Sequence, residues 1–169
     1  MRFAILGAAL ALAGCGDAGE PAATETPSTP VAEPVPALEE LSEADLAQTD
    51  LAGELACTFR RSEGRSEEGG PIFLGRGDVL DEAGAEGAVK YDGAVRKLAM
   101  EGRGGYDAMA DGARFEGSGF TLTIATTGDE PLVEEPRVAM ESPIYPATLT
   151  FTISGEAEQT IEGVFECGP

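Results

Sequence analysis

The feature that most constrains this chain is the recurrence of apolar side chains at every second residue. The alternation is clearest in four runs, whose apolar members are Leu55, Cys57 and Phe59; Phe120, Leu122 and Ile124; Leu149, Phe151 and Ile153; and Ile161, Phe165 and Cys167. Because successive side chains of a strand point to opposite faces, each run predicts a strand with one face buried and the other exposed to solvent. Such half-buried strands are typical of antiparallel sheets.

The remaining strands are expected where turn signals separate shorter apolar runs. Residues 71–80 form one such run, and two more flank Asp92-Gly93, a dipeptide that favours a tight hairpin turn. A short run at residues 113–116 and a turn at residues 155–158 complete the series. We therefore predict an all-β domain over residues 54–169, an antiparallel sandwich or small barrel of about eight strands.

Helices are expected at only two places, and both are short. Within residues 38–48, Ser42 and Asp45 have the spacing of a capping box, which marks the start of a helix. A single helical turn is expected at residues 106–111, where Gly112 would end it. Helices of so few turns are marginal unless they pack against the rest of the fold.

Cys57 and Cys167 both fall on the inward face of their strands, one near the start of the domain and one near its end. In an oxidising compartment such a pair predicts a disulfide, which would join the first strand to the last. On the chain-entropy view, closing so long a loop stabilises a fold by about 4 to 5 kcal/mol. Two free buried thiols are the alternative. A redox-active pair is disfavoured because the C-x-x-C spacing is absent.

The first fifteen residues have the form of a secretory signal. Arg2 supplies positive charge, and the apolar run that follows, about ten residues, is too short to cross a bilayer. The run ends in Leu12-Ala13-Gly14-Cys15, which resembles the lipobox of bacterial lipoproteins. The resemblance implies that residues 1–14 are removed and that Cys15 is acylated. An uncleaved anchor, or ordinary cleavage that leaves Cys15 as a thiol, are the alternatives.

The residues after Cys15 predict a tether to the membrane. Residues 15–37 are rich in Pro, Ala, Thr and Glu and hold almost no large apolar residue, so we expect them to be disordered. Residues 38–53 are expected to be further linker that carries the short helix. Gly16 follows the cysteine, where the best-known sorting rule for these lipoproteins reads aspartate as an inner-membrane signal. The resemblance therefore implies the periplasmic face of the outer membrane.

Charge and composition exclude several functions. The chain has 31 acidic and 11 basic residues, a net charge of −20, which would repel nucleic acid. It has no histidine, so Ser-His and Cys-His pairs and histidine zinc sites are absent. We therefore expect no enzyme, no cofactor and no metal. A calcium site in the acidic hairpin is the alternative, and its oxygen ligands would be Asp78, Asp81, Glu82 and Glu86.

Several short motifs, in order, resemble those of the membrane-bound inhibitors of c-type lysozyme, small periplasmic lipoproteins with a β-barrel fold. The corresponding segments here are Leu55-Ala56-Cys57, Tyr91-Asp92-Gly93 to Leu98, Asp111-Gly112-Ala113-Arg114-Phe115, Thr127-Gly128-Asp129-Glu130-Pro131 and the closing Cys167. In that family a serine and a lysine of the third and fourth segments insert into the lysozyme cleft. Asp111 and Thr127 stand at those positions here, so the inhibitory side chains are not shared.

These observations predict a non-catalytic binding or structural domain, anchored by lipid in the cell envelope and facing a protein partner in the periplasm. The candidate binding loops are residues 104–112 and 126–135. The candidate binding residues are Asp111, Arg114, Phe115, Thr127 and Asp129. The alternative function is inhibition of a lysozyme-type hydrolase, for which an acidic protein meeting a basic enzyme is electrostatically favourable.

Overall fold

The computed structural model describes residues 37–62, 69–79, 82–132 and 142–169. Signal peptide, Cys15 and the tether lie outside these ranges, so their predictions stay predictions. Neither of the two helices within the described ranges has the length or apolar character needed to cross a bilayer.

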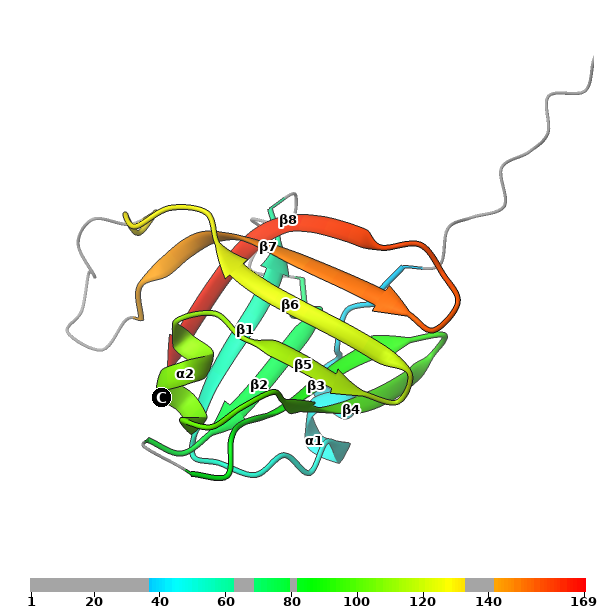
Figure 1. The fold of residues 1–169 in the computed structure, drawn as a ribbon, viewed down its shortest axis with the longest axis horizontal. Helices are drawn as coiled ribbons and strands as arrows, with labels where there is room; N and C mark the ends of the chain where they lie inside the picture. Colours follow the sequence, from blue (N-terminus) through cyan, green and yellow to red (C-terminus); the bar gives the residue numbers. More distant parts are fainter. Residues whose placement is uncertain (1–36, 63–68, 80–81, 133–141) are drawn as a thin grey trace, which may run out of the picture. The chain divides into compact units, whose positions relative to one another are not determined.

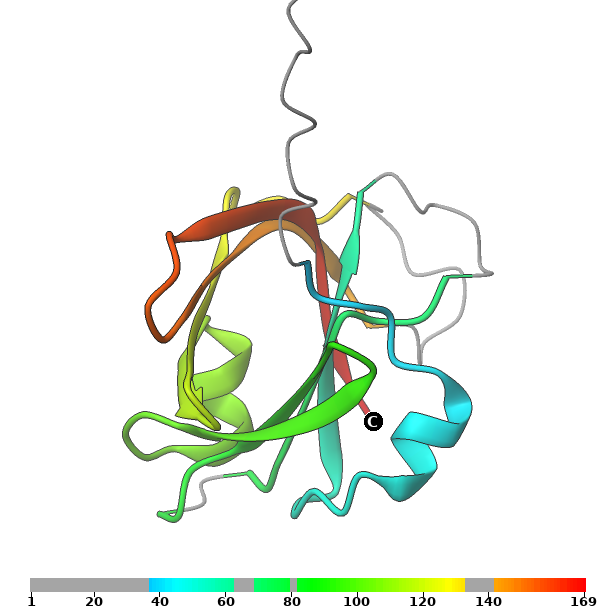
Figure 2. The same ribbon diagram turned by 90° about the vertical axis from the view of Figure 1, so that its right-hand side faces the viewer.

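Eight antiparallel strands, in chain order, form one closed barrel (Figure 1). The strands are β1 (Leu55–Arg61), β2 (Phe73–Gly77), β3 (Glu86–Tyr91), β4 (Ala94–Met100), β5 (Arg114–Gly117), β6 (Phe120–Thr126), β7 (Ile144–Ile153) and β8 (Gln159–Gly168). Each strand pairs with the next, and β8 returns to pair with β1, so the sheet closes into a ring (Figure 2). The predicted all-β class is confirmed, and of the two architectures expected the barrel is the one formed.

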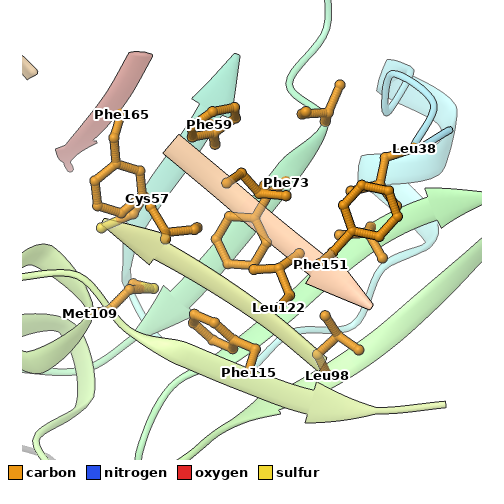
Figure 3. Packing of buried hydrophobic residues seen from close by; sticks show 14 of the residues in the cluster. Leu38, Cys57, Phe59, Phe73, Leu98, Met109, Phe115, Leu122, Phe151 and Phe165 are labelled. Atoms are coloured by element: carbon orange, nitrogen blue, oxygen red, sulfur yellow. The ribbon is translucent and has the colours of Figure 1, made fainter. Parts of the chain in front are cut away.

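Side chains from the inward faces of the strands fill the barrel. The largest buried ones include Phe59, Phe73, Phe115, Phe151, Phe165, Leu122, Ile124 and Leu149. The rings of Phe73 and Phe115 pack together at a centroid distance of 4.9 Å, and both belong to the cluster drawn in Figure 3. The interior of an eight-stranded barrel is just wide enough to be filled by side chains. The apolar side chains that alternate along the strands therefore form the core, as the sequence predicts.

The seam between β1 and β8 closes the barrel and carries the disulfide. Cys57 lies directly opposite Cys167 in the antiparallel register, and the two are bonded. The predicted disulfide is confirmed, and it joins the first strand to the last. Arg60 and Glu166 add an ion pair at 3.1 Å on the outer face of the same seam.

Helix α2 (Gly105–Ala110) closes one end of the barrel. Its Met109 is completely buried and contacts the core beside Cys57 (Figure 3). A side chain at Gly75 of β2 would collide with the Met109 sulfur, so glycine there makes room for the helix. The helix was expected over residues 106–111 and is found one residue earlier, ending before Gly112 as predicted.

The segment before the barrel, residues 37–53, packs against it and is not a linker. Leu38 and Leu41 are 2% and 1% exposed, and Leu38 belongs to the barrel core. The backbone oxygen of Leu38 accepts a hydrogen bond from Arg61, the last residue of β1, so this segment covers the end opposite α2. The compact unit therefore includes every described residue from 37 onward, which corrects the domain boundary expected at residue 54.

The segment contains the predicted short helix, α1 (Glu43–Gln48), with the predicted capping box of Ser42 and Asp45. The Asp45 carboxylate also lies 2.9 Å from the Lys90 ammonium of β3. Hydrogen bonds from Ser42 and from Lys90 lower the pKa of Asp45 to about 2. Asp45 is therefore ionised at neutral pH, and its charge ties the helix to the barrel wall.

Candidate binding site

A pocket of about 450 Å³ opens beside α2, at the end of the barrel that this helix closes, called the α2 end below. It is lined by residues from four places in the chain: α2 and its C-terminal cap, the segment after β6, the start of β7 and the end of β8. Its size is in the range of pockets that bind small molecules or single side chains. Four segments far apart in sequence thus meet at one surface depression.

The turn after α2 sets one wall of the pocket. Asp111 is the C-cap of the helix, and Gly112 has a φ of +98°, which reverses the chain into β5. A Cβ at Gly112 would lie 2.9 Å from the Ile124 oxygen, so only glycine lets this turn pack against β6. That close packing places Asp111 beside Thr126, the last residue of β6, on the pocket lining.

The segment after β6 forms the opposite wall. Thr127 donates its backbone N–H to the Pro146 oxygen of β7 over 2.8 Å. This bond holds the chain against β7 as it leaves the barrel, and the next two residues, Gly128 and Asp129, line the pocket. Tyr145, one residue before Pro146 on β7, completes this side.

The lining is acidic and aromatic. The Asp111 and Asp129 side chains are exposed, and the Tyr106 and Tyr145 side chains are half-buried. Burial, with the nearby charge of Asp107, raises the pKa of Tyr106 above its ordinary value. Phe165 of the barrel core is the most deeply buried lining residue. The pocket therefore offers negative charge at its rim and apolar surface beneath.

Of the five predicted binding residues, three lie at this pocket. Asp111 and Asp129 line it, and Thr127 sits between lining residues. Arg114 and Phe115 do not line it, because both belong to strand β5, where a strand was expected at residues 113–116. Arg114 points outward and pairs with Glu101 and Glu116, and Phe115 is completely buried in the core.

Sequence reasoning missed the two tyrosines. Tyr106 lies inside the predicted loop 104–112, but its side chain was not singled out. Tyr145 lies beyond the second predicted loop. The chain has only three tyrosines, and two of them meet at this pocket. The small number of tyrosines was the one feature of the sequence that could have marked them as candidate binding residues.

The acidic hairpin predicted as an alternative calcium site is engaged in other contacts. Asp78 accepts a hydrogen bond from the backbone of Glu54 at 2.9 Å. Glu86 accepts one from Ala52 at 2.8 Å and lies 3.5 Å from Lys97. Asp81 falls outside the described residues. Within the part of the chain that the structure describes, no three Asp, Glu or Cys side chains are grouped as metal ligands.

Comparisons with protein-family models, with curated proteins and with solved structures find no match to this chain. No relative therefore bears on the lipobox or on the resemblance to lysozyme inhibitors, and both remain hypotheses.

Proposed function

We propose that this chain is a lipid-anchored protein of the bacterial envelope, without catalytic activity, that binds a protein partner in the periplasm at the α2 end of its barrel. The observation that carries the proposal is the pocket itself. Two loops chosen as binding loops from the sequence, which begin 22 residues apart, both contribute to its lining through Asp111 and Asp129.

Two features of the barrel exclude its interior and its strand edges as binding sites. Its interior is occupied by phenylalanine and aliphatic side chains, so a ligand cannot enter without displacing the core. Each of the eight described strands pairs with two neighbours, so a partner strand finds no open edge to extend. The end opposite α2 is covered by Leu38 and the segment around it. Of the two ends, the α2 end, with its pocket, is therefore the one left open to a partner.

The anchoring half of the proposal rests on Cys15 and the tether that follows it. At about 3.1 Å per residue, an extended tether over residues 16–37 would let the barrel reach roughly 70 Å from the bilayer. Two or more acyl chains hold a protein stably at a membrane, whereas one holds it only marginally. The barrel would thus be fixed to the envelope and still free to meet a partner.

Replacing the acylated residue, Cys15→Ser, is expected to move the protein from the membrane fraction to the soluble periplasm. Acylation requires the thiol, so the serine variant would lack the acyl chains that hold the protein at the bilayer. Cell fractionation followed by immunoblotting measures the change, and mass spectrometry of the natural protein should find acyl chains on Cys15. Continued membrane association of the serine variant would contradict the proposal.

Partner binding is tested by a photo-crosslinking amino acid placed at Thr127, beside the pocket. Glu158, exposed in the turn between β7 and β8 at the opposite end, is the matched control position. Irradiation of living cells is expected to yield a discrete protein adduct from position 127 and none from position 158. Equal labelling at both positions, or no adduct at position 127, would refute binding at the α2 end.

The alternative function, inhibition of a lysozyme-type hydrolase, is favoured by one observation. The two segments that resemble the inhibitory motifs, around Asp111 and Thr127, lie on either side of the same pocket. The side chains at these positions differ from those of the family, so we expect no inhibition. In a lysis assay with purified c-type lysozyme, slowing at a near-stoichiometric ratio would favour the alternative over our proposal.

A further inference from the structure

We infer that the α2-end pocket receives a cationic side chain, specifically an arginine, presented by a basic protein partner. This inference rests on the proposed function and names the chemistry of its partner. It is drawn from three independent features of the pocket: its charge, its aromatic walls and its apolar base.

The charge of the pocket is unbalanced. Asp111 and Asp129 come from different segments and both line it, while none of its described lining residues is basic. Within the described ranges neither aspartate forms an ion pair, whereas Arg60, Lys90, Lys97 and Arg114 are each paired with other carboxylates. The pocket therefore keeps a charge of −2 that the described basic residues do not neutralise. The chain's net charge of −20 would further attract a basic partner.

The aromatic walls suit a cation. The faces of tyrosine rings carry negative electrostatic potential and attract ammonium and guanidinium groups. Tyr106 and Tyr145 are half-buried on the lining, one from α2 and one from β7. A guanidinium is planar and weakly hydrated, so it stacks on such rings and donates to a carboxylate in pairs of hydrogen bonds. These properties favour arginine over lysine.

The base of the pocket suits the aliphatic stem of the side chain. Phe165 is 2% exposed and belongs to the barrel core, and Ala110 and Pro143 add apolar surface to the lining. Long basic side chains bury their methylene groups on such surface and leave the charged head among polar groups. Negative charge at the rim above apolar surface is therefore the arrangement that an arginine side chain complements.

The test is a titration of the full chain carrying Cys15→Ser with a short peptide, acetyl-Gly-Arg-Gly-amide, followed by NMR. Saturable shifts are expected at the Gly128 and Asp129 amides and at the Tyr106 and Tyr145 rings. A peptide with citrulline in place of arginine keeps the shape without the charge and should not shift them. The lysine peptide should bind more weakly than the arginine peptide.

The double variant Asp111→Asn with Asp129→Asn is expected to weaken arginine-peptide binding about tenfold, through loss of charge-assisted contacts. The control variant Asp92→Asn with Glu158→Gln removes the same charge at the opposite end and should bind as the parent does. Circular dichroism establishes that both variants are folded.

Four results would overturn the inference: no saturable shift, equal binding of the citrulline peptide, equal or tighter binding of the lysine peptide, or equal weakening in the two variants. Failure here is distinguishable from failure of the proposed function. If position 127 crosslinks to a partner in cells but the arginine peptide does not bind, only the cationic assignment is wrong. If position 127 gives no adduct, the proposed function itself fails.

Discussion

Replacing both bonded cysteines, Cys57→Ala with Cys167→Ala, is expected to lower the free energy of unfolding by about 4 to 5 kcal/mol. The bond joins residues that are 110 positions apart, so it removes a large amount of conformational freedom from the unfolded chain. It also lies on the seam between β1 and β8, the one pairing that converts a sequential sheet into a closed barrel. Loss of so much of a domain's typical stability would leave this fold marginal.

Urea unfolding of the parent and the double variant, followed by circular dichroism, measures this loss. The parent treated with a reducing agent should shift by a similar amount. The matched control is Arg60→Ala with Glu166→Ala, which removes a non-covalent pair from the same seam. Because that ion pair is partly exposed, its removal should cost less than about 1 kcal/mol. Equal losses in the two double variants would contradict the role given to the disulfide.

The sequence predicts the strands of this fold better than their closure. Alternation states which side chain points inward, and it placed Phe59, Leu122 and Phe151 in the core correctly. It does not state which strands are neighbours, because a sandwich and a barrel use the same inward faces. Only the predicted disulfide placed the first strand near the last, and such a bond is compatible with either a sandwich or a barrel. Pairing of β8 with β1 decides the question.

The segment before the barrel shows a second limit. Ser42 with Asp45 predicted the start of the helix correctly, whereas the burial of Leu38 and Leu41 was not predicted. The surface on which this segment lies is formed by residues distant in sequence, since Glu39 and Leu41 donate backbone hydrogen bonds to the oxygens of Lys90 and Pro71. Local patterns carry no information about that surface, so the segment was predicted as a linker.

The candidate site was predicted in part. Asp111 and Asp129 were named because both belong to segments that resemble the inhibitor motifs. Phe115 was chosen because it falls within one of the short matching segments. The alternation Arg114, Phe115, Glu116 argued for an inward phenylalanine on a strand, and the structure follows the alternation. A short motif match and the alternation of apolar residues gave different roles to Phe115. The alternation is the stronger evidence because it directly reflects which side chains of a strand are buried.

Phe115→Ala is the second large expected effect, and it separates a core role from a binding role. The Phe115 ring is completely buried and packs against the Phe73 ring at a centroid distance of 4.9 Å. Truncation of a buried phenylalanine to alanine removes apolar burial and leaves a cavity, at a typical cost of about 3 to 5 kcal/mol. We expect the free energy of unfolding to fall by that amount, because the closed ring of strands cannot collapse easily into the space.

Urea unfolding measures the loss, with Arg114→Ala as the control at the neighbouring position. Arg114 lies on the outer face in exposed ion pairs, so its truncation should change the free energy of unfolding by less than about 1 kcal/mol. Conditions that keep the Phe115→Ala variant folded should leave arginine-peptide binding unchanged, because Phe115 does not line the pocket. A stable variant that has lost peptide binding would instead return Phe115 to the binding site and contradict the packing described for the barrel.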